Sequence, residues 1–440
     1  MKLTYRPEID GLRAIAVVAV ILYHAQITIF GYQPFKGGFI GVDIFFVISG
    51  YLITSIILKE LLTTGSFSFK YFYERRVRRI LPALLFVMLV SLPFAWMYLL
   101  PSSFSDFSKS ILYSLGFSSN FYFHYSGQQY GAESGFLKPF LHTWSLSVEE
   151  QFYILFPIVL LVTFKFFRKY LIHILTLGFI ISLGLADYGS RNHPSVSFYF
   201  IHTRMWELLA GSILAYFEIK LGHRSKNKTL NLILPLIGLI LIITTIVFFK
   251  FHFPHPSFYT LPSILGTCLI IWFGNEKDFT SKLLSSKIFV TLGLVSYSLY
   301  LWHYVIFSYD YIVEFSGNDL SKKFLLIVVS LSLSLITYYF IEKPARNKNN
   351  KFNLIITIIF LFYFILIVLN IFIIQNNGFN KRLPDILKNN NVSKDTIINL
   401  LKNSELKICH NNIDMCIFNN SSKKKIHIIG DSHMASVTFD

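Results

Sequence analysis

Residues 12–30 read LRAIAVVAVILYHAQITIF. A membrane core roughly 30 Å thick is crossed by a helix of about 17–25 apolar residues, so this run is long enough to span it. It is similar to the apolar core of a secretory signal, but it carries Arg13 and His24 and has no clear cleavage site. We therefore expect a retained transmembrane helix that holds two ionisable side chains.

Apolar runs of similar length recur along the chain. Hydrophobic residues make up 53% of the 440 residues and charged residues only 15%, against about 25% charged in ordinary globular proteins. This composition excludes disorder, a coiled coil, a disulfide scaffold and a simple soluble enzyme, and it predicts an all-α polytopic membrane protein. Ten runs follow the first, of which 148–164 and 171–186 are the weakest: 39–58, 80–100, 148–164, 171–186, 199–217, 230–249, 258–274, 289–308, 324–341 and 352–374.

The basic residues predict the orientation of these eleven spans. If the N-terminus is cytoplasmic, every inside loop between spans has at least three Lys or Arg residues and no outside loop has more than two. An odd number of spans then places the C-terminal tail outside. The net charge of +16 is spread over cytoplasmic loops, where it contacts anionic lipid. A nucleic-acid partner is not expected, because such a protein gathers its charge on one face.

Four segments follow from this pattern. Residues 1–351 form one membrane unit of ten spans, and 352–374 reads as a tethering helix without charge or His in its core. Residues 375–425 read as a polar outside linker; its Cys409 and Cys416 could form a disulfide or remain free thiols. Residues 426–440 begin with a strand-like run and a tight Gly-Asp-Ser turn. A strand and a turn cannot make a core, so we expect an incomplete α/β domain there, in a chain that is a fragment or a truncated product.

Arg13 and His24 share one face of the first helix. Eleven steps of 100° end about 20° beyond three full turns, and they separate the two side chains by about 16 Å along the axis. Ionisable groups inside a bilayer usually mark a pathway or a site, although lipid snorkelling for Arg13 and packing for His24 would explain either residue alone. Together they predict a tunnel with an anion-binding mouth and a base or nucleophile at depth.

A second basic site stands in FYERRVRRILP, residues 72–82. Ordinary topology signals explain part of this charge, but four Arg and no Lys within five residues exceed that need. Residues three apart share a helix face, which pairs Arg75 with Arg78 and Arg76 with Arg79. We expect phosphate binding here.

Other polar residues near the spans have two interpretations each. His142 and Trp144 could line an acceptor entrance or belong to an interfacial aromatic belt. Glu149 and Glu150, assigned to the outer end of the fourth span, point about 100° apart on a helix. We therefore expect at most one of them to face the interior, as an acceptor or relay group.

Three further positions are read as structural or left open. Arg204 and Glu207 are three apart within a span and are predicted to form an ion pair. His303 is predicted to pack in the core or at the interface. Asp43 faces either the tunnel or a partner such as Lys36, and the sequence leaves that choice open.

Eight short stretches resemble, in order over residues 5–346, the membrane acyltransferase family 3, bacterial O-acyltransferases of cell-surface sugars. They are YRPEIDGLRAIAVVAVILYH, GGFIGVDIFFVISGYLIT, FYERRVRRILP, SNFYF, HTWSLSVEEQFY, RMWELLAG, SYSLYLWHY and FIEKPAR. The tail sequence GDSH resembles the start of a fused SGNH-type hydrolase domain.

The resemblance implies a ten-helix acyltransferase bundle in the bacterial inner membrane. It implies transfer of an acyl group, usually acetyl, from cytoplasmic acyl-CoA to a hydroxyl of an extracytoplasmic glycan such as lipopolysaccharide O-antigen. The family pattern makes His24 catalytic and Arg13 a CoA contact, and its second basic pattern falls on Arg75 and Arg78, with Arg76 and Arg79 as neighbours that could substitute. Ser432 would be the nucleophile of a completed SGNH domain, whose activating Asp-x-x-His pair is absent here.

Two alternatives remain beside this interpretation. Peptidoglycan is a second acceptor, and a non-enzymatic membrane carrier of a lipid-linked sugar is a function of another class. Acetyl-CoA enters as donor co-substrate, and no metal is expected, because the sequence has no His, Cys or Asp cluster at metal-ligand spacing.

Overall fold

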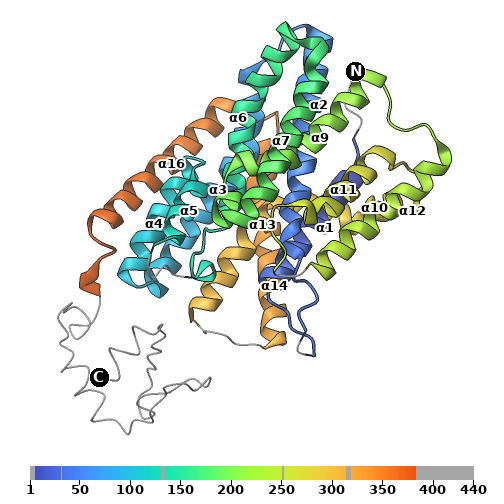
Figure 1. Ribbon diagram of the computed structural model, residues 1–440. Coiled ribbons are helices and arrows are strands. Elements are labelled where there is room, and N and C mark those ends of the chain that lie inside the picture. The colour runs from blue at the N-terminus through green and yellow to red at the C-terminus, as the bar shows by residue number, and fades with distance from the viewer. Residues whose placement is uncertain (1–4, 31, 130–133, 250–251, 314–318, 383–440) are drawn as a thin grey trace. The chain divides into compact units, whose positions relative to one another are not determined.

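The computed structural model describes residues 5–30, 32–129, 134–249, 252–313 and 319–382. Regular structure in these residues is helical (Figure 1). The chain divides into two compact units, Met1–Gln375 and Asn376–Asp440. The predictions for Cys409, Cys416, Ser432 and the start of an α/β domain lie outside the described residues.

The helices of the first unit follow one another with short connections. The α-helices are α1 (Pro7–His24), α2 (Gly41–Thr64), α3 (Phe69–Tyr98), α4 (Pro101–Leu115), α5 (Ser119–Gly127), α6 (Thr143–Phe166), α7 (Leu171–Asn192), α8 (Pro194–Tyr199), α9 (Ile201–Leu221), α10 (Lys228–Phe248), α11 (Leu261–Phe273), α12 (Phe279–Leu284), α13 (Lys287–Val313), α14 (Leu320–Thr337), α15 (Lys343–Arg346) and α16 (Phe352–Gln375). Short 3₁₀ turns lie at Gly38–Ile40, Gly135–Leu137, Arg168–Tyr170 and Phe258–Thr260, and a π-helical turn at Tyr338–Glu342. In the second unit, Asn380–Arg382 forms a 3₁₀ turn.

Each of the eleven predicted runs coincides with one of these helices, which confirms an all-α polytopic membrane fold. Among the described residues, eight helices are long and apolar enough to cross a membrane by length and composition: α2, α3, α6, α7, α10, α13, α14 and α16. Helix α11 is apolar but shorter. Helices α1 and α9 each contain three or more charged residues, which lowers their hydropathy.

Helices α1 and α3 begin well before their predicted runs, and the residues at each start explain why. Helix α1 begins at Pro7, a residue favoured in the first helical turn, with Glu8 and Asp10 beside the positive helix end. Helix α3 begins at Phe69, after Ser68, whose side chain accepts a hydrogen bond from the Tyr71 amide at 3.3 Å. The run of four arginines therefore lies inside α3 and not in a loop.

Glycines allow the central helices to approach one another closely. A Cβ atom on Gly50 of α2 would lie 1.8 Å from the Leu208 carbonyl oxygen of α9, and one on Gly211 of α9 would lie 2.0 Å from the Val47 carbonyl oxygen of α2. Small residues at such contacts are typical of helix packing in membranes. The contact fixes α2, which carries Asp43, against α9, which carries Arg204.

Helix α1 lies in the interior of the first unit and packs against α2, α12 and α13 (Figure 1). Its contact with α13 depends on Gly293, where a Cβ atom would lie 1.9 Å from the Asp10 carbonyl oxygen. Leu12, Ala16 and Val17 are fully buried. Helix α1 therefore presents Arg13 and His24 to its neighbours and not to lipid alone.

Candidate active site

One cavity lies among α1, α2, α3, α6 and α13, and we call it the arginine cavity. The space in it, including the part open to solvent, is about 780 Å³, and its lining includes Arg13, Arg76, Arg79 and Glu149. Three guanidinium groups thus face one carboxylate, which leaves excess positive charge. Guanidinium groups bind phosphate through paired hydrogen bonds, so the cavity suits an anionic ligand.

Two helices supply these cations. Arg76 and Arg79 are three residues apart on α3 and line the same cavity, as the predicted pairing on one helix face requires. Arg13 of α1 donates to Asp10 Oδ1 at 2.8 Å, which leaves other donors of its guanidinium group for a ligand. Opposite them, Ser49 of α2 donates to Glu149 of α6 at 2.5 Å.

The other two arginines of the run have different surroundings. Arg78 is buried, and its guanidinium group donates to the carbonyl oxygens of Ala345, Asn347 and Asn350 at 3.1–3.3 Å. Arg75 lies over the Tyr71 ring, 4.4 Å from its centroid. Neither lines the arginine cavity, because α3 turns these two residues toward the segment before α16 and toward its own first turn. The geometry thus favours Arg76 and Arg79 over Arg75 and Arg78 as ligand contacts.

We call a second cavity the histidine cavity; the space in it, including the part open to solvent, is about 2090 Å³. Its lining includes His24, His142, Trp144, His255 and Tyr304. These residues come from α1, from the N-terminal end of α6, from the α10–α11 connection and from α13. His24 and Arg13, which share one helix face, therefore open on different cavities.

His24 lies against His303 of α13, and the contact fixes which nitrogen of each ring carries hydrogen. Nδ1 of His303 lies 3.2 Å from the Leu299 carbonyl oxygen, and a carbonyl oxygen can only accept, so this nitrogen carries the hydrogen. Nε2 of a neutral His303 is then an acceptor, and it lies 3.2 Å from Nδ1 of His24. Nδ1 of His24 must donate, which leaves the lone pair on its Nε2. His24 is thereby prepared as a base or a nucleophile.

His142 is a third imidazole beside this pair. It is buried, and its ring centroid lies 5.9 Å from that of His303 and 5.2 Å from that of Tyr304. Both of its ring nitrogens lack a hydrogen-bond partner among the described residues. A buried polar group without a partner calls for an explanation, and a ligand in the histidine cavity would supply one.

The two cavities adjoin. Val42 and Tyr300 line both of them. The Tyr300 hydroxyl lies 2.6 Å from the Ser145 hydroxyl and donates to the His142 carbonyl oxygen at 2.9 Å, so hydrogen bonds hold the ring between the cavities. The Tyr300 side chain and Val42 thus form a thin partition along the path from Arg13 to His24.

Helix α6 divides its predicted site residues between the two cavities. His142 and Trp144, at its N-terminal end, line the histidine cavity, whereas Glu149, about two turns further along, lines the arginine cavity. Glu150 is buried, and its Oε1 has no partner among the described residues. The expectation that only one of the two carboxylates faces a cavity agrees with this arrangement. The predicted grouping of Glu149 with His142 and Trp144 as acceptor or relay residues does not agree with it, because these residues line different cavities.

Three features near the histidine cavity go beyond what the sequence predicts. His303 is buried in the core, as predicted, and it also contacts His24. Asp43 pairs with Arg204 and His255 and not with Lys36. His255 was not singled out at all; its only local signal is a His-Pro step in a loop between two apolar runs. The predicted Arg204–Glu207 ion pair is confirmed, at 3.0 Å.

Comparisons with known proteins agree with this architecture. The model of the family described as "Acyltransferase domain" (acyltransferase family 3) matches residues 6–339. The chain is 33% identical over 425 residues to "Putative O-acetyltransferase SAR0937" of Staphylococcus aureus strain MRSA252, covering 90% of this chain and 67% of that protein. It is 33% identical over 366 residues to "Peptidoglycan O-acetyltransferase OatA" of Listeria monocytogenes, covering 79% of this chain and 57% of that protein.

A further relative, "O-acetyltransferase OatA" of S. aureus, is 32% identical over 364 residues, or 79% of this chain and 58% of that protein. The chain therefore spans between 57% and 67% of the length of these relatives. No solved structure matches the chain. The family match covers both cavities and nearly all of the helices that form them. The chain belongs to acyltransferase family 3 and is a multi-pass membrane acyltransferase.

Proposed function

We propose that this chain transfers an acetyl group from cytoplasmic acetyl-CoA to a hydroxyl of an extracytoplasmic glycan. One observation carries the proposal. A cation-lined cavity and an imidazole-lined cavity adjoin at Val42 and Tyr300, with Arg13 and His24 of one helix on either side. In the proposed orientation, the N-terminus and the arginine cavity face the cytoplasm of a bacterial inner membrane.

The arginine cavity suits the donor. CoA carries several phosphate charges and ends in a long flexible arm with a thioester at its tip. Arg13, Arg76 and Arg79 would bind phosphate, while the apolar lining, which includes Phe45, Leu52 and Ile80, would contact the arm. This assigns the donor site to Arg76 and Arg79 in preference to Arg75 and Arg78.

The partition suits the passage of a small group. An ionised nucleotide is very unfavourable in hydrocarbon, whereas an acetyl group is small and neutral. The thioester end of the arm would pass Val42 and the Tyr300 ring and reach His24 about 16 Å beyond Arg13 along the helix. The charged part of the donor would remain on the cytoplasmic side throughout.

His24 is proposed as the catalytic residue and His303 as the residue that positions it. With its lone pair on Nε2, His24 can accept the proton of an attacking hydroxyl. It can also take the acetyl group itself, in which case the carbon–sulfur bond breaks and the sulfur leaves with the electron pair. His303 acts through His24 in both cases, because it holds Nδ1–H of that ring.

The acceptor is proposed to be a cell-envelope glycan in the histidine cavity. Of the two predicted acceptors, lipopolysaccharide O-antigen comes first and peptidoglycan second. The name of the Listeria relative favours peptidoglycan for this chain. His142 and Trp144 line this cavity and are proposed acceptor contacts. Ser432 would act on the acceptor only as part of a complete SGNH domain.

Membrane vesicles of inverted orientation test the proposal. They expose the cytoplasmic face, so acetyl-labelled acetyl-CoA is added outside, and a peptidoglycan disaccharide is enclosed inside. We expect label to leave CoA and to appear in the lumen as ester or free acetate, only in vesicles that contain the chain.

The carrier alternative gives the opposite result. A carrier of a lipid-linked sugar has no covalent step with acetyl-CoA, so all label would remain on CoA. That outcome would reject the proposed activity, whichever acceptor the lumen contains.

A further inference from the structure

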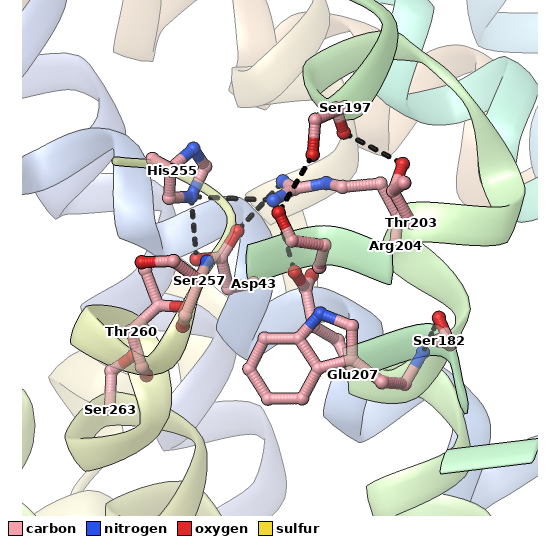
Figure 2. Close-up of polar contacts among 12 residues, drawn as sticks. Asp43, Ser182, Ser197, Thr203, Arg204, Glu207, His255, Ser257, Thr260 and Ser263 are labelled. Atoms are coloured by element: carbon pink, nitrogen blue, oxygen red, sulfur yellow. Dashed lines mark hydrogen bonds and ion pairs between the residues drawn. The ribbon is translucent and has the colours of Figure 1, made fainter. Parts of the chain in front are cut away.

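The imidazole of His255, which also lines the histidine cavity, is held by a buried ionic cluster (Figure 2). Asp43 Oδ1 accepts from Arg204 Nη2 at 2.8 Å, and Asp43 Oδ2 lies 3.0 Å from Nε2 of His255. Arg204 also lies 3.0 Å from Glu207 Oε1. Asp43, Arg204 and Glu207 are all fully buried, so the cluster is isolated from water.

The contacts fix the hydrogen on His255. Arg204 Nη1 lies 3.3 Å from the same Nε2 that lies 3.0 Å from Asp43, and one nitrogen cannot donate and accept in the plane of the ring at once. A carboxylate paired with arginine can only accept, and its contact is the shorter, so Nε2 carries the hydrogen. The lone pair of neutral His255 is then on Nδ1, which points away from Asp43 and Arg204 in Figure 2.

The loop that carries His255 is firmly held. Ser257 donates to the Pro254 carbonyl oxygen at 2.6 Å, and Thr260 donates to that of Ser257 at 2.7 Å. The Phe253 ring stacks on Tyr259 with centroids 4.6 Å apart. His255 is therefore presented to the histidine cavity in a defined position, like a group on a helix.

Aromatic rings pack around the cluster. The Phe39 and Phe198 centroids lie 4.7 and 6.0 Å from that of His255, and the Arg204 guanidinium lies 5.4 Å from the Trp144 ring. In such an environment the hydrogen bond to Asp43 is stronger than in water. Burial lowers the pKa of His255 from its ordinary value, while the nearby Asp43 carboxylate opposes that shift. The ring is thus neutral and ready to take a proton at neutral pH.

We propose that His255, oriented by Asp43, is the catalytic base that removes the proton from the acceptor hydroxyl in the histidine cavity. The proposal rests on the acetyl transfer proposed above and adds the acceptor half of that reaction. Asp43 is a positioning residue, and Arg204 holds Asp43 in place.

The step balances as a simple acyl transfer. The acceptor O–H bond breaks, and its proton goes to Nδ1 of His255. The oxygen forms a bond to the acetyl carbonyl carbon. With His255 as the base, His24 is the acetyl carrier, so the bond from that carbon to Nε2 of His24 breaks with its electron pair on that nitrogen. His255 is left as an imidazolium ion beside the Asp43 carboxylate, which stabilises it.

The same cluster could instead serve only to tie the α10–α11 loop to α2 and α9. These interpretations differ in what replacing the ring does. A loss of anchoring affects donor binding, stability and transfer together, and free imidazole cannot reverse it. Loss of a base affects delivery to the acceptor, and a small base in the vacated space can restore it.

The test uses the full chain in inverted vesicles with acetyl-labelled acetyl-CoA outside and the peptidoglycan disaccharide inside. We compare His255→Ala with His173→Ala. His173 is an exposed histidine of α7 and lines neither the arginine cavity nor the histidine cavity. Acetyl-CoA binding, lumenal acetyl ester plus acetate, and rescue by added imidazole are measured for each variant.

We expect His255→Ala to lower lumenal delivery by about 10²-fold, as typical for loss of a general base, with acetyl-CoA affinity unchanged and partial recovery in imidazole. His173→Ala should stay within about twofold of the original chain, as a substitution away from buried contacts usually does. Normal delivery by His255→Ala, or a loss that imidazole does not reverse, would overturn the assignment. If the original chain itself leaves all label on CoA, the proposed acetyl transfer fails instead.

Discussion

The two cavities of this membrane bundle are lined by different kinds of polar group. In the arginine cavity, three guanidinium groups face a single carboxylate in the lining, and Arg13 is also paired with Asp10, so an excess of positive charge remains. In the histidine cavity, the chemistry lies in imidazoles that contact one another or an aspartate. The first arrangement binds anions, and the second moves protons. One helix, α1, contributes a residue to each.

The difference shows that a few side chains can separate the groups that bind the donor from the groups that act on its acetyl group. Val42 and Tyr300 are shared by both cavity linings, so the groups that hold the donor and those that act on the acetyl group lie on adjacent sides of one partition. Substitutions on the arginine side should therefore alter donor affinity, and those on the histidine side should alter the rate.

Replacement of His24 should have the largest effect on rate. In His24→Ala the lone pair held ready by His303 is lost, and we expect transfer to fall by about 10⁴-fold, the upper range for an essential acid–base group. Acetyl-CoA affinity should remain, because Arg13, Arg76 and Arg79 are intact. Transfer and binding are measured on the same vesicles, and turnover at the original rate would remove His24 from the mechanism.

Replacement of Asp43 should have an intermediate effect with a characteristic pH dependence. Asp43→Asn keeps an acceptor for Nε2–H of His255 but removes the negative charge that raises the pKa of this histidine. That pKa should then fall further, and a weaker base should lower the rate by about 10-fold to 10²-fold. His255 acts in its neutral form, so the rate rises with pH through its pKa, and the acid limb should move to lower pH in the variant.

The rate of transfer as a function of pH checks this prediction. The groups that face His255 are Asp43 and Arg204, with Glu207 behind Arg204. Of these, Arg204 and Glu207 are unchanged in the variant. A uniform loss of rate without any shift of the acid limb would indicate that Asp43 only stabilises the fold.

Substitutions in the arginine run should have the smallest effects, but Arg76→Ala and Arg78→Ala should change different properties. Arg76→Ala removes a cation of the arginine cavity and should weaken acetyl-CoA binding by about 10-fold, the effect of losing one hydrogen bond to a charged group. Arg78→Ala removes donors from three carbonyl oxygens, so it should lower the unfolding temperature and leave affinity nearly unchanged. Equilibrium binding and thermal unfolding distinguish the two, and the reverse pattern would show that the cavity contact was assigned to the wrong residue.

The sequence was sufficient for features that depend on one helix. The length of the apolar runs gave the membrane helices, and helical geometry placed Arg13 and His24 on one face, where each lines a cavity. The spacing within the arginine run paired Arg76 with Arg79. It could not choose between this pair and Arg75 with Arg78, because the choice depends on how α3 is rotated against its neighbours.

Features that join distant segments could not be derived in the same way. His24 and His303 are 279 residues apart, and Asp43 and His255 are 212 residues apart. Their contacts follow from close packing at glycines such as Gly50 and Gly293, which no local pattern reveals. Helices that are apolar on every side give little indication of which face meets lipid and which meets protein.

A chemical measurement of the path between the cavities tests the central claim most directly. The three native cysteines, Cys268, Cys409 and Cys416, are replaced by alanine, His24→Cys is introduced, and a mixed disulfide of CoA is added from the cytoplasmic face. We predict a covalent CoA adduct at position 24 that acetyl-CoA suppresses and that Arg76→Ala reduces. An unreactive position 24, or an adduct that forms equally well without Arg76, would mean that the arm of CoA does not reach the histidine cavity from the arginine cavity.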